Sequence, residues 1–250
     1  MKGRKGDRII VKNVSKKFRI GRKPQSSLAR FISIFSGKEP KKNFLALKNV
    51  SFNVEKGEIL GLIGDNGSGK SSLLRIIAGI YDSDEGSIYT DGKIISLINL
   101  FIGLQERLTM RDNIYMCCSL FGLYREDIGK RFYSIVEFAE LESFLNTKLY
   151  QFSDGMLQRL AFSIAIHCDP EILLIDEVFE VGDEEFREKS SRRIREIVRN
   201  GGSVILISHD MNMIRKYCDR ALWLDDGKIK EIGRPKEIIG GYLRGSGRKK

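Results

Sequence analysis

A glycine-rich stretch that ends in lysine and serine has the clearest chemistry in this sequence. Residues 64–71 read Gly-Asp-Asn-Gly-Ser-Gly-Lys-Ser and fit the pattern G-x-x-x-x-G-K-[ST]. In this pattern backbone N–H groups surround the phosphates of a nucleoside triphosphate, the lysine reaches the β- and γ-phosphates, and the serine hydroxyl ligates Mg²⁺. We therefore expect a nucleotide-binding loop, and its predicted binding residues are Gly64, Asp65, Asn66, Gly67, Ser68, Gly69, Lys70, Ser71 and Ser72.

The elements on either side of this loop have the order that phosphate binding requires. An apolar run of strand type, 58–63, precedes it, and residues 71–78 have the apolar spacing of a buried helix that ends at Gly79. The loop can then direct its N–H groups and the positive end of the helix at the phosphates. We expect the loop to need its three glycines because a Cβ atom at these positions would block this approach. A chance glycine-rich turn is the alternative, and the flanking strand and helix argue against it.

A pair of carboxylates follows a second apolar run. Residues 171–175 form a strand-like segment that ends in Asp176 and Glu177. Ligands gather at the carboxyl ends of parallel strands, so we expect Asp176 to hold Mg²⁺ through its water shell and Glu177 to orient the attacking water. Alone, such a run usually marks a strand end with a solvated turn. Downstream of a phosphate loop it indicates hydrolysis.

A histidine follows a third apolar run, 202–208. A single histidine at a strand end is more often structural than functional, but the position of His209 in this series of strands favours a hydrogen bond to the γ-phosphate. The predicted catalytic residues are therefore Lys70, Glu177 and His209, and the predicted metal ligands are Ser71 and Asp176.

The composition is that of a globular protein. The chain has 250 residues, of which 42% are hydrophobic and 30% charged. No stretch approaches the ~18 apolar residues of a membrane-spanning helix. The basic start, residues 1–7, lacks the apolar core of a signal peptide, so we expect the chain to stay in the cytosol. The cysteines lack a CxxC spacing, which favours reduced packing residues over a zinc site; they are Cys117, Cys118, Cys168 and Cys218.

Positive charge is in excess. The 43 Lys and Arg against 33 Asp and Glu give a net charge of +10. This balance suits a polyanionic partner or the anionic inner face of a membrane, and equally a basic surface that is merely solvated. Residues 21–43 form a basic insertion with one short apolar segment, which would either cap the core or lie against a membrane or a membrane partner.

The pattern along the chain predicts an α/β core interrupted by helices. Turn signals at 55–57, 90–92 and 225–227 indicate strands that pair across them, and hence an antiparallel layer beside a parallel sheet. The expected strands are Arg8–Val14, Val50–Val54, Ile59–Ile63, Ser87–Tyr89, Ile94–Leu97, Ile172–Ile175, Val204–Ile207, Ala221–Leu224 and Ile229–Ile232. The expected helices of the middle third are Asn113–Phe121, Arg125–Phe138, Leu141–Phe144 and Asp154–Ile166.

One further segment carries a family resemblance. Residues 152–160, Phe-Ser-Asp-Gly-Met-Leu-Gln-Arg-Leu, resemble the signature motif of ATP-binding-cassette (ABC) ATPases, L-S-G-G-Q, with Ser153 and Gly155 at matching positions and Met156 in place of Gln. In that family two cassettes face head to tail, and each ATP lies between the phosphate loop of one subunit and the signature helix of the other. Without the other motifs, this segment would be only a helix N-cap.

The resemblance extends from Val14 to about Tyr242. It implies a P-loop NTPase fold of the ABC cassette type, with a RecA-like core at 1–100 and 165–245, an antiparallel β layer and a helical subdomain inserted at about 101–164, followed by a basic tail at 246–250. Phe18 resembles the aromatic residue that stacks on adenine, although a packing role is the alternative. Asp183 resembles a residue of the loop that crosses the dimer interface.

Within the family the chain is most similar to the ATPases of polysaccharide exporters, through residues 46–52, 108–114, 152–156 and 176–183. This implies a homodimer that binds ATP and Mg²⁺, docks on two copies of an integral membrane subunit at the cytoplasmic face of the inner membrane, and powers export of a lipid-linked, O-antigen-like glycan. The family's Mg²⁺-binding glutamine has only one counterpart in this region, Gln105, which comes later than usual.

Other functions compete with this interpretation. A soluble ABC ATPase acting on nucleic acid or the ribosome would tolerate the basic charge, but a second cassette, a long coiled coil or a zinc element is missing, which makes nucleic acid an unlikely partner. An ABC ATPase for another substrate remains open. A cassette that binds without hydrolysing is disfavoured by Lys70, Asp176, Glu177 and His209.

Overall fold

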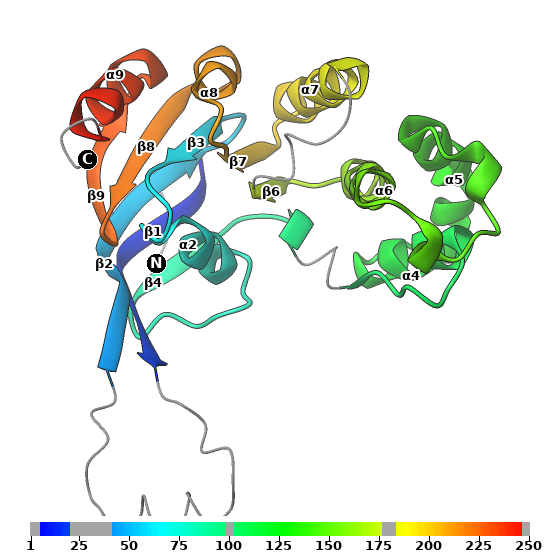
Figure 1. The fold of residues 1–250 in the computed structure, drawn as a ribbon, viewed down its shortest axis with the longest axis horizontal. Coiled ribbons are helices and arrows are strands. Elements are labelled where there is room, and N and C mark those ends of the chain that lie inside the picture. The colour runs from blue at the N-terminus through cyan, green and yellow to red at the C-terminus, as the bar shows by residue number, and fades with distance from the viewer. Residues whose placement is uncertain (1–5, 21–41, 99–102, 177–183, 247–250) are drawn as a thin grey trace, which may run out of the picture.

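The computed structural model of the chain describes residues 6–20, 42–98, 103–176 and 184–246. Its strands form two sheets (Figure 1). The smaller sheet is antiparallel with the order β2-β1-β4, and its strands are β1 (Asp7–Ile20), β2 (Lys42–Glu55) and β4 (Glu85–Thr90).

The larger sheet has six strands in the order β5-β6-β7-β3-β8-β9. Neighbouring strands from β5 to β8 are parallel, and β9 is antiparallel at the edge. The strands are β3 (Ile59–Ile63), β5 (Ile94–Ser96), β6 (Ile172–Asp176), β7 (Ser203–Ile207), β8 (Arg220–Asp225) and β9 (Lys228–Gly233). The mixed α/β fold with a parallel sheet and an antiparallel layer confirms the predicted fold class.

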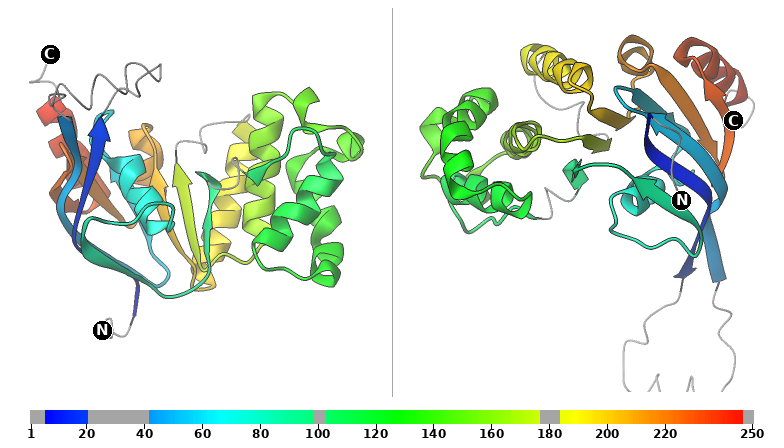
Figure 2. Two further views of the ribbon diagram at one scale, coloured as in Figure 1. Left: turned by 90° about the horizontal axis from the view of Figure 1, so that it is seen from below. Right: turned by 180° about the vertical axis from the view of Figure 1, so that it is seen from behind.

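Helices cover the larger sheet and extend to one side of it. They are α2 (Lys70–Ile77), α4 (Met110–Leu120), α5 (Arg125–Ala139), α6 (Asp154–His167), α7 (Glu184–Arg199), α8 (Met211–Tyr217) and α9 (Pro235–Ser246), with short 3₁₀ turns η1 (Glu142–Phe144) and η2 (Leu149–Gln151). Figures 1 and 2 show α4, α5 and α6 as a group on the side away from the antiparallel sheet. Among the described residues, no helix combines the length and the apolar character needed to cross a bilayer.

Two apolar cores lie on opposite faces of the larger sheet. Side chains alternate across a strand, so neighbouring residues of one strand enter different cores. Leu60 and Leu62 pack with α2 and the antiparallel sheet, whereas Ile59 and Ile63 pack with the helices of the other face. The phosphate loop that follows Ile63 is therefore anchored by a strand that is buried on both faces.

The two sheets correct part of the turn prediction. The turn at 225–227 joins β8 to its antiparallel partner β9, as predicted. The turns at 55–57 and 90–92 instead lead from the smaller sheet into the larger one, since β2 and β4 pair with β1 whereas β3 and β5 pair with other strands. A glycine turn redirects the chain locally. Which strand the next strand pairs with depends on the burial of side chains from distant segments.

Several element boundaries also differ from the prediction. β1 and β2 pair over nearly their whole length and continue well beyond the predicted ends at Val14 and Val50. Polar residues of these extensions, such as Lys17, face solvent, so they gave no apolar signal. The segment predicted as a helix at Leu141–Phe144 is a single 3₁₀ turn. All four cysteines are reduced and buried, as expected.

Candidate nucleotide-binding site

The carboxyl ends of three adjacent strands bring the predicted motifs to one edge of the larger sheet. Leu62 of β3 pairs with Ile207 of β7, and Ile207 pairs with Asp176 of β6. The loop that starts at Gly64 and the segment that contains His209 follow directly after β3 and β7. Parallel strands thus bring together the phosphate loop, the half-buried Asp176 and the exposed His209, as ligand binding at such an edge requires.

The three glycines of the loop differ in what surrounds them. All three have positive φ: 151° at Gly64, 81° at Gly67 and 107° at Gly69. A Cβ at Gly64 would lie 2.2 Å from the Leu224 carbonyl oxygen, and one at Gly69 would lie 2.5 Å from that of Ala46. A Cβ at Gly67 would have no described atom within 4 Å. Backbone packing therefore requires two of the glycines, and only Gly67 borders open space.

Lys70 is the first residue of α2 and is 5% exposed. Its ammonium donates hydrogen bonds to the carbonyl oxygens of Gly64 at 2.8 Å and Asp65 at 3.0 Å. The helix has Gly69 at its N-cap, without a side-chain cap, and no acidic residue in its first turn. Uncapped N–H groups at a helix N-terminus favour an anion, so the loop fits a phosphate.

The buried Ser68 supports the same interpretation. Its N–H donates to the Asp65 carbonyl oxygen at 3.1 Å, which tightens the loop. Its Oγ has no hydrogen-bond partner among the described residues. Of the other predicted nucleotide contacts, Asn66 is exposed, and Ser71 and Ser72 are half-buried on the first turn of α2.

Phe18 lies on β1 and already has aromatic and cationic neighbours. Its ring meets that of Tyr81 edge to face, with centroids 5.5 Å apart, and the Lys16 ammonium lies 5.7 Å from its centroid. The side chain is half-buried. These contacts support the packing alternative, and the stacking of Phe18 on adenine stays a prediction.

Ser153 and Gly155 begin α6, which stands with α4 and α5 apart from α2 in Figures 1 and 2. The Ser153 hydroxyl accepts a hydrogen bond from the Met156 N–H at 3.3 Å and so caps the helix. A Cβ at Gly155 would meet only Ser153 Oγ, at 3.9 Å. Within the described part of the chain, no close packing requires a glycine at 155.

The remaining predicted residues are Glu177, Asp183 and Gln105. Glu177 and Asp183 lie outside the described residues, and their roles stay predictions. Gln105 is exposed, and its backbone is fixed by Asn113, whose Oδ1 accepts from the Gln105 N–H at 2.8 Å and whose Nδ2 donates to the Gln105 carbonyl at 3.1 Å.

Two hydrogen-bond partners of the loop were also not predicted. Gly227, in the β8–β9 turn, donates its N–H to the Ser68 carbonyl oxygen at 2.9 Å. The Tyr242 hydroxyl on α9 donates to Asp65 Oδ1 at 2.9 Å. The sequence indicated the turn at Gly227. It could not indicate either contact with the loop, because each one joins segments that are far apart in the sequence.

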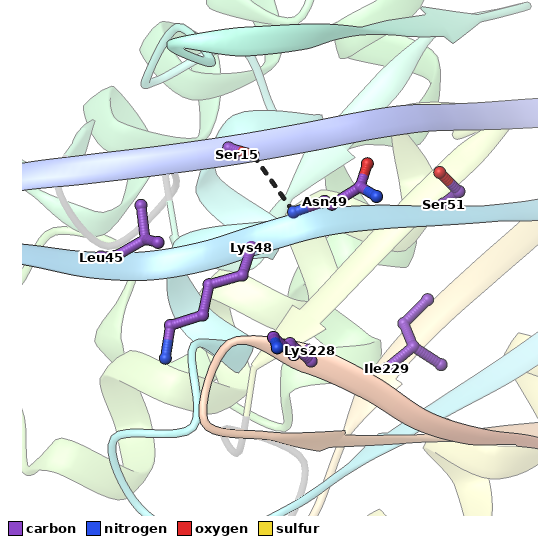
Figure 3. A pocket seen from close by; sticks show the side chains of 7 residues that line it. All are labelled: Ser15, Leu45, Lys48, Asn49, Ser51, Lys228 and Ile229. Atoms are coloured by element: carbon purple, nitrogen blue, oxygen red, sulfur yellow. Dashed lines mark hydrogen bonds between the residues drawn. The ribbon is translucent and has the colours of Figure 1, made fainter.

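A groove of about 640 Å³ lies on the flank of the antiparallel sheet, where β1, β2 and the start of β9 meet (Figure 3). Its lining includes Lys48, Asn49 and Lys228, and none of the predicted site residues. The Lys48 N–H donates to the Gly227 carbonyl oxygen at 2.8 Å, so the groove adjoins the turn that supports the phosphate loop. It is not the nucleotide site.

Comparison with known proteins agrees with the family resemblance of the sequence. Residues 47–180 match the family described as ABC transporter. The chain is 39% identical over 198 residues to the O-antigen export system ATP-binding protein RfbB of Klebsiella pneumoniae, covering 79% of this chain and 80% of that protein. It is 36% identical over 239 residues to the teichoic acids export ATP-binding protein TagH of Listeria innocua, covering 95% and 70% of the two chains.

A longer relative and a solved structure extend the comparison. The RfbB protein of Myxococcus xanthus is 35% identical over 94% of this chain, which spans 55% of that protein. The dimeric ATP-binding cassette MJ0796 in a post-hydrolysis state with ADP and Pi has a TM-score of 0.74 and 27% identity, covering 91% of this chain and 98% of that one.

Proposed function

The chain belongs to the ABC transporter family, and we propose that it is the subunit whose ATP hydrolysis powers export of a lipid-linked, O-antigen-like polysaccharide. It is an ABC-type ATPase cassette that binds ATP. The observation that carries the choice of substrate is its similarity to relatives named as O-antigen and teichoic acid export subunits, over 79% to 95% of its length.

We propose that the phosphates lie over the first turn of α2. Lys70 would exchange its bonds to the Gly64 and Asp65 carbonyls for bonds to phosphate oxygens. Ser71 and Asp176 would hold Mg²⁺, which when bound neutralises charge on the phosphates. Glu177 would orient the attacking water, and His209 would donate a hydrogen bond to the γ-phosphate. Phosphoryl transfer requires little more than this positioning and charge stabilisation.

We propose that the working unit is a head-to-tail homodimer. Ser153 and Gly155 would meet the ATP held by the partner subunit's loop, and Asp183 would lie at the dimer interface. Open space at Gly155 supports this arrangement, because a phosphate can approach the start of α6 there. The dimeric state of the similar cassette MJ0796 supports it as well.

We propose that the dimer docks on two copies of a membrane subunit at the cytoplasmic face of the inner membrane. Exposed apolar side chains close to Gln105 support this, namely Leu108 and Tyr150. They come from neighbouring segments, since the Leu149 N–H donates to the Leu108 carbonyl and the Tyr150 N–H to that of Glu106. Closure of the dimer on ATP would move this surface and change the membrane pathway.

The test is ATPase activity with and without the membrane subunit in lipid vesicles. Lipid-linked glycan should stimulate hydrolysis only when that subunit is present. Leu108→Ala with Tyr150→Ala should reduce the ratio of stimulated to basal activity, whereas Tyr89→Ala, an exposed aromatic on β4, should not. Stimulation by DNA or ribosomes instead, with no dependence on a membrane subunit, would favour a soluble ABC ATPase.

A further inference from the structure

The last described helix reaches the phosphate loop through one side chain. The Tyr242 hydroxyl of α9 donates a hydrogen bond to Asp65 Oδ1 at 2.9 Å, across 177 positions of sequence. Asp65 is the second residue of the loop, directly after Gly64, and its side chain is exposed. This contact therefore fixes the position of a negative charge beside the predicted phosphate site.

Close packing of α9 on β8 holds Tyr242 in place. The ring of Trp223 meets that of Tyr242 edge to face, with centroids 5.6 Å apart. A Cβ at Gly245 would lie 2.8 Å from the Trp223 ring, so only glycine permits this approach. Ile238 and Ile239 anchor the same helix in the core at 1% and 0% exposure. Figure 1 shows α9 alongside β8 and β9.

The same tryptophan connects this packing to the base of the loop. Trp223 pairs with Ile63, the last residue of β3, in the parallel ladder. Gly64 and Asp65 follow Ile63 directly. The loop and Tyr242 thus rest on one rigid support, and rigid neighbours are what hold a functional side chain in a defined position.

A carboxylate in a phosphate loop opposes nucleotide binding, because it repels the triphosphate. We propose that Tyr242 is a positioning residue for ATP binding, whose hydroxyl holds the Asp65 carboxylate toward α9 and away from the phosphates. This inference rests on the proposed role of the loop in binding phosphate. It assigns to α9 a part in nucleotide affinity without any contact to the nucleotide.

The test is the affinity of the full chain for Mg²⁺-ATP, measured by calorimetry. Tyr242→Phe removes only the hydroxyl and should weaken binding roughly 3- to 10-fold, the range of one lost hydrogen bond. In the Asp65→Ala background the same change should have no effect. Tyr133→Phe, at an exposed position on α5, is the matched control and should leave affinity unchanged.

Salt dependence separates this role from simple packing. The effect of Tyr242→Phe should shrink between about 0.05 and about 0.5 M salt, because charge repulsion is screened. Asp65 is a predicted nucleotide contact through its backbone N–H, which alanine keeps. Asp65→Ala alone should therefore bind ATP at least as tightly as the wild type, which keeps the idea testable if Tyr242→Phe fails to fold. An equal loss in both backgrounds, no loss at all, or weaker binding by Asp65→Ala would overturn it. Failure of the wild type to bind ATP would instead refute the proposed function.

Discussion

The ammonium of Lys70 lies 2.8 Å from the carbonyl oxygen of Gly64, so the cation expected at the phosphates is held by its own loop. A second bond runs to the Asp65 carbonyl oxygen. ATP must therefore compete with these backbone acceptors for one buried amine. The same bonds keep the amine pointing into the loop before the nucleotide arrives.

Lys70→Ala should therefore abolish most ATP affinity. Hydrogen bonds to charged groups contribute about 1.5 to 3 kcal/mol each, so the loss should be at least about tenfold, and roughly 10²- to 10⁴-fold if two such bonds are involved. Calorimetric titration with Mg²⁺-ATP measures it, with melting in the absence of nucleotide as the control for folding. Wild-type affinity in a folded Lys70→Ala protein would remove Lys70 from the site.

Alanine substitutions at the three glycines of the loop should destabilise the fold to different extents. Gly64→Ala and Gly69→Ala place a Cβ against a backbone carbonyl at positive φ, so each should destabilise the fold by more than about 2 kcal/mol. Gly67→Ala meets no described neighbour and should cost only about 1 to 2 kcal/mol from its φ. Denaturant unfolding without nucleotide distinguishes them. Equal losses at all three positions would contradict the packing described for Gly64 and Gly69.

These glycines also show where the sequence was informative. The pattern located the loop, its strand and its helix, because phosphate binding imposes a fixed local order of residue types. It could not reveal that Ala46 and Leu224 lie against the loop, or that Tyr242 reaches Asp65, because those contacts are set by the pairing of distant strands. The strand pairings predicted across the turns at 55–57 and 90–92 were wrong for the same reason.

The composite site can be tested by mixing two inactive subunits. A heterodimer of a Lys70→Ala subunit and a Gly155→Asp subunit has one site with both lesions and one site with neither. It should retain ATPase activity that both mutant homodimers lack. Because a side chain at 155 meets only Ser153 Oγ, Gly155→Asp should fold normally, and its melting temperature serves as the control. Inactivity of the heterodimer would argue against intact composite sites that act independently.

His167 should affect the stability of the fold at acidic pH. Burial lowers the pKa of His167 below its usual value, against the opposing effect of the hydrogen bond to the Ser163 carbonyl. The folded state therefore favours neutral His167. Its stabilising contribution is complete above the unfolded pKa of about 6.5 and is lost as pH falls through that value toward the folded pKa.

His167→Gln should consequently reduce the fall in melting temperature between about pH 7 and about pH 5, compared with the wild type. Thermal melting monitored by circular dichroism at several pH values measures this difference. An unchanged slope in His167→Gln would show that this group does not govern the transition.

Hydrolysis by a composite dimer is the central claim, and Glu177→Gln tests it most directly. The substitution keeps a side chain of similar size but removes the carboxylate proposed to orient water, so turnover should fall by about 100-fold or more while ATP still binds. Size-exclusion chromatography with Mg²⁺-ATP should then show the variant as a stable dimer and the wild type mainly as a monomer. Hydrolysis at the wild-type rate by Glu177→Gln, without an ATP-dependent dimer, would contradict the account.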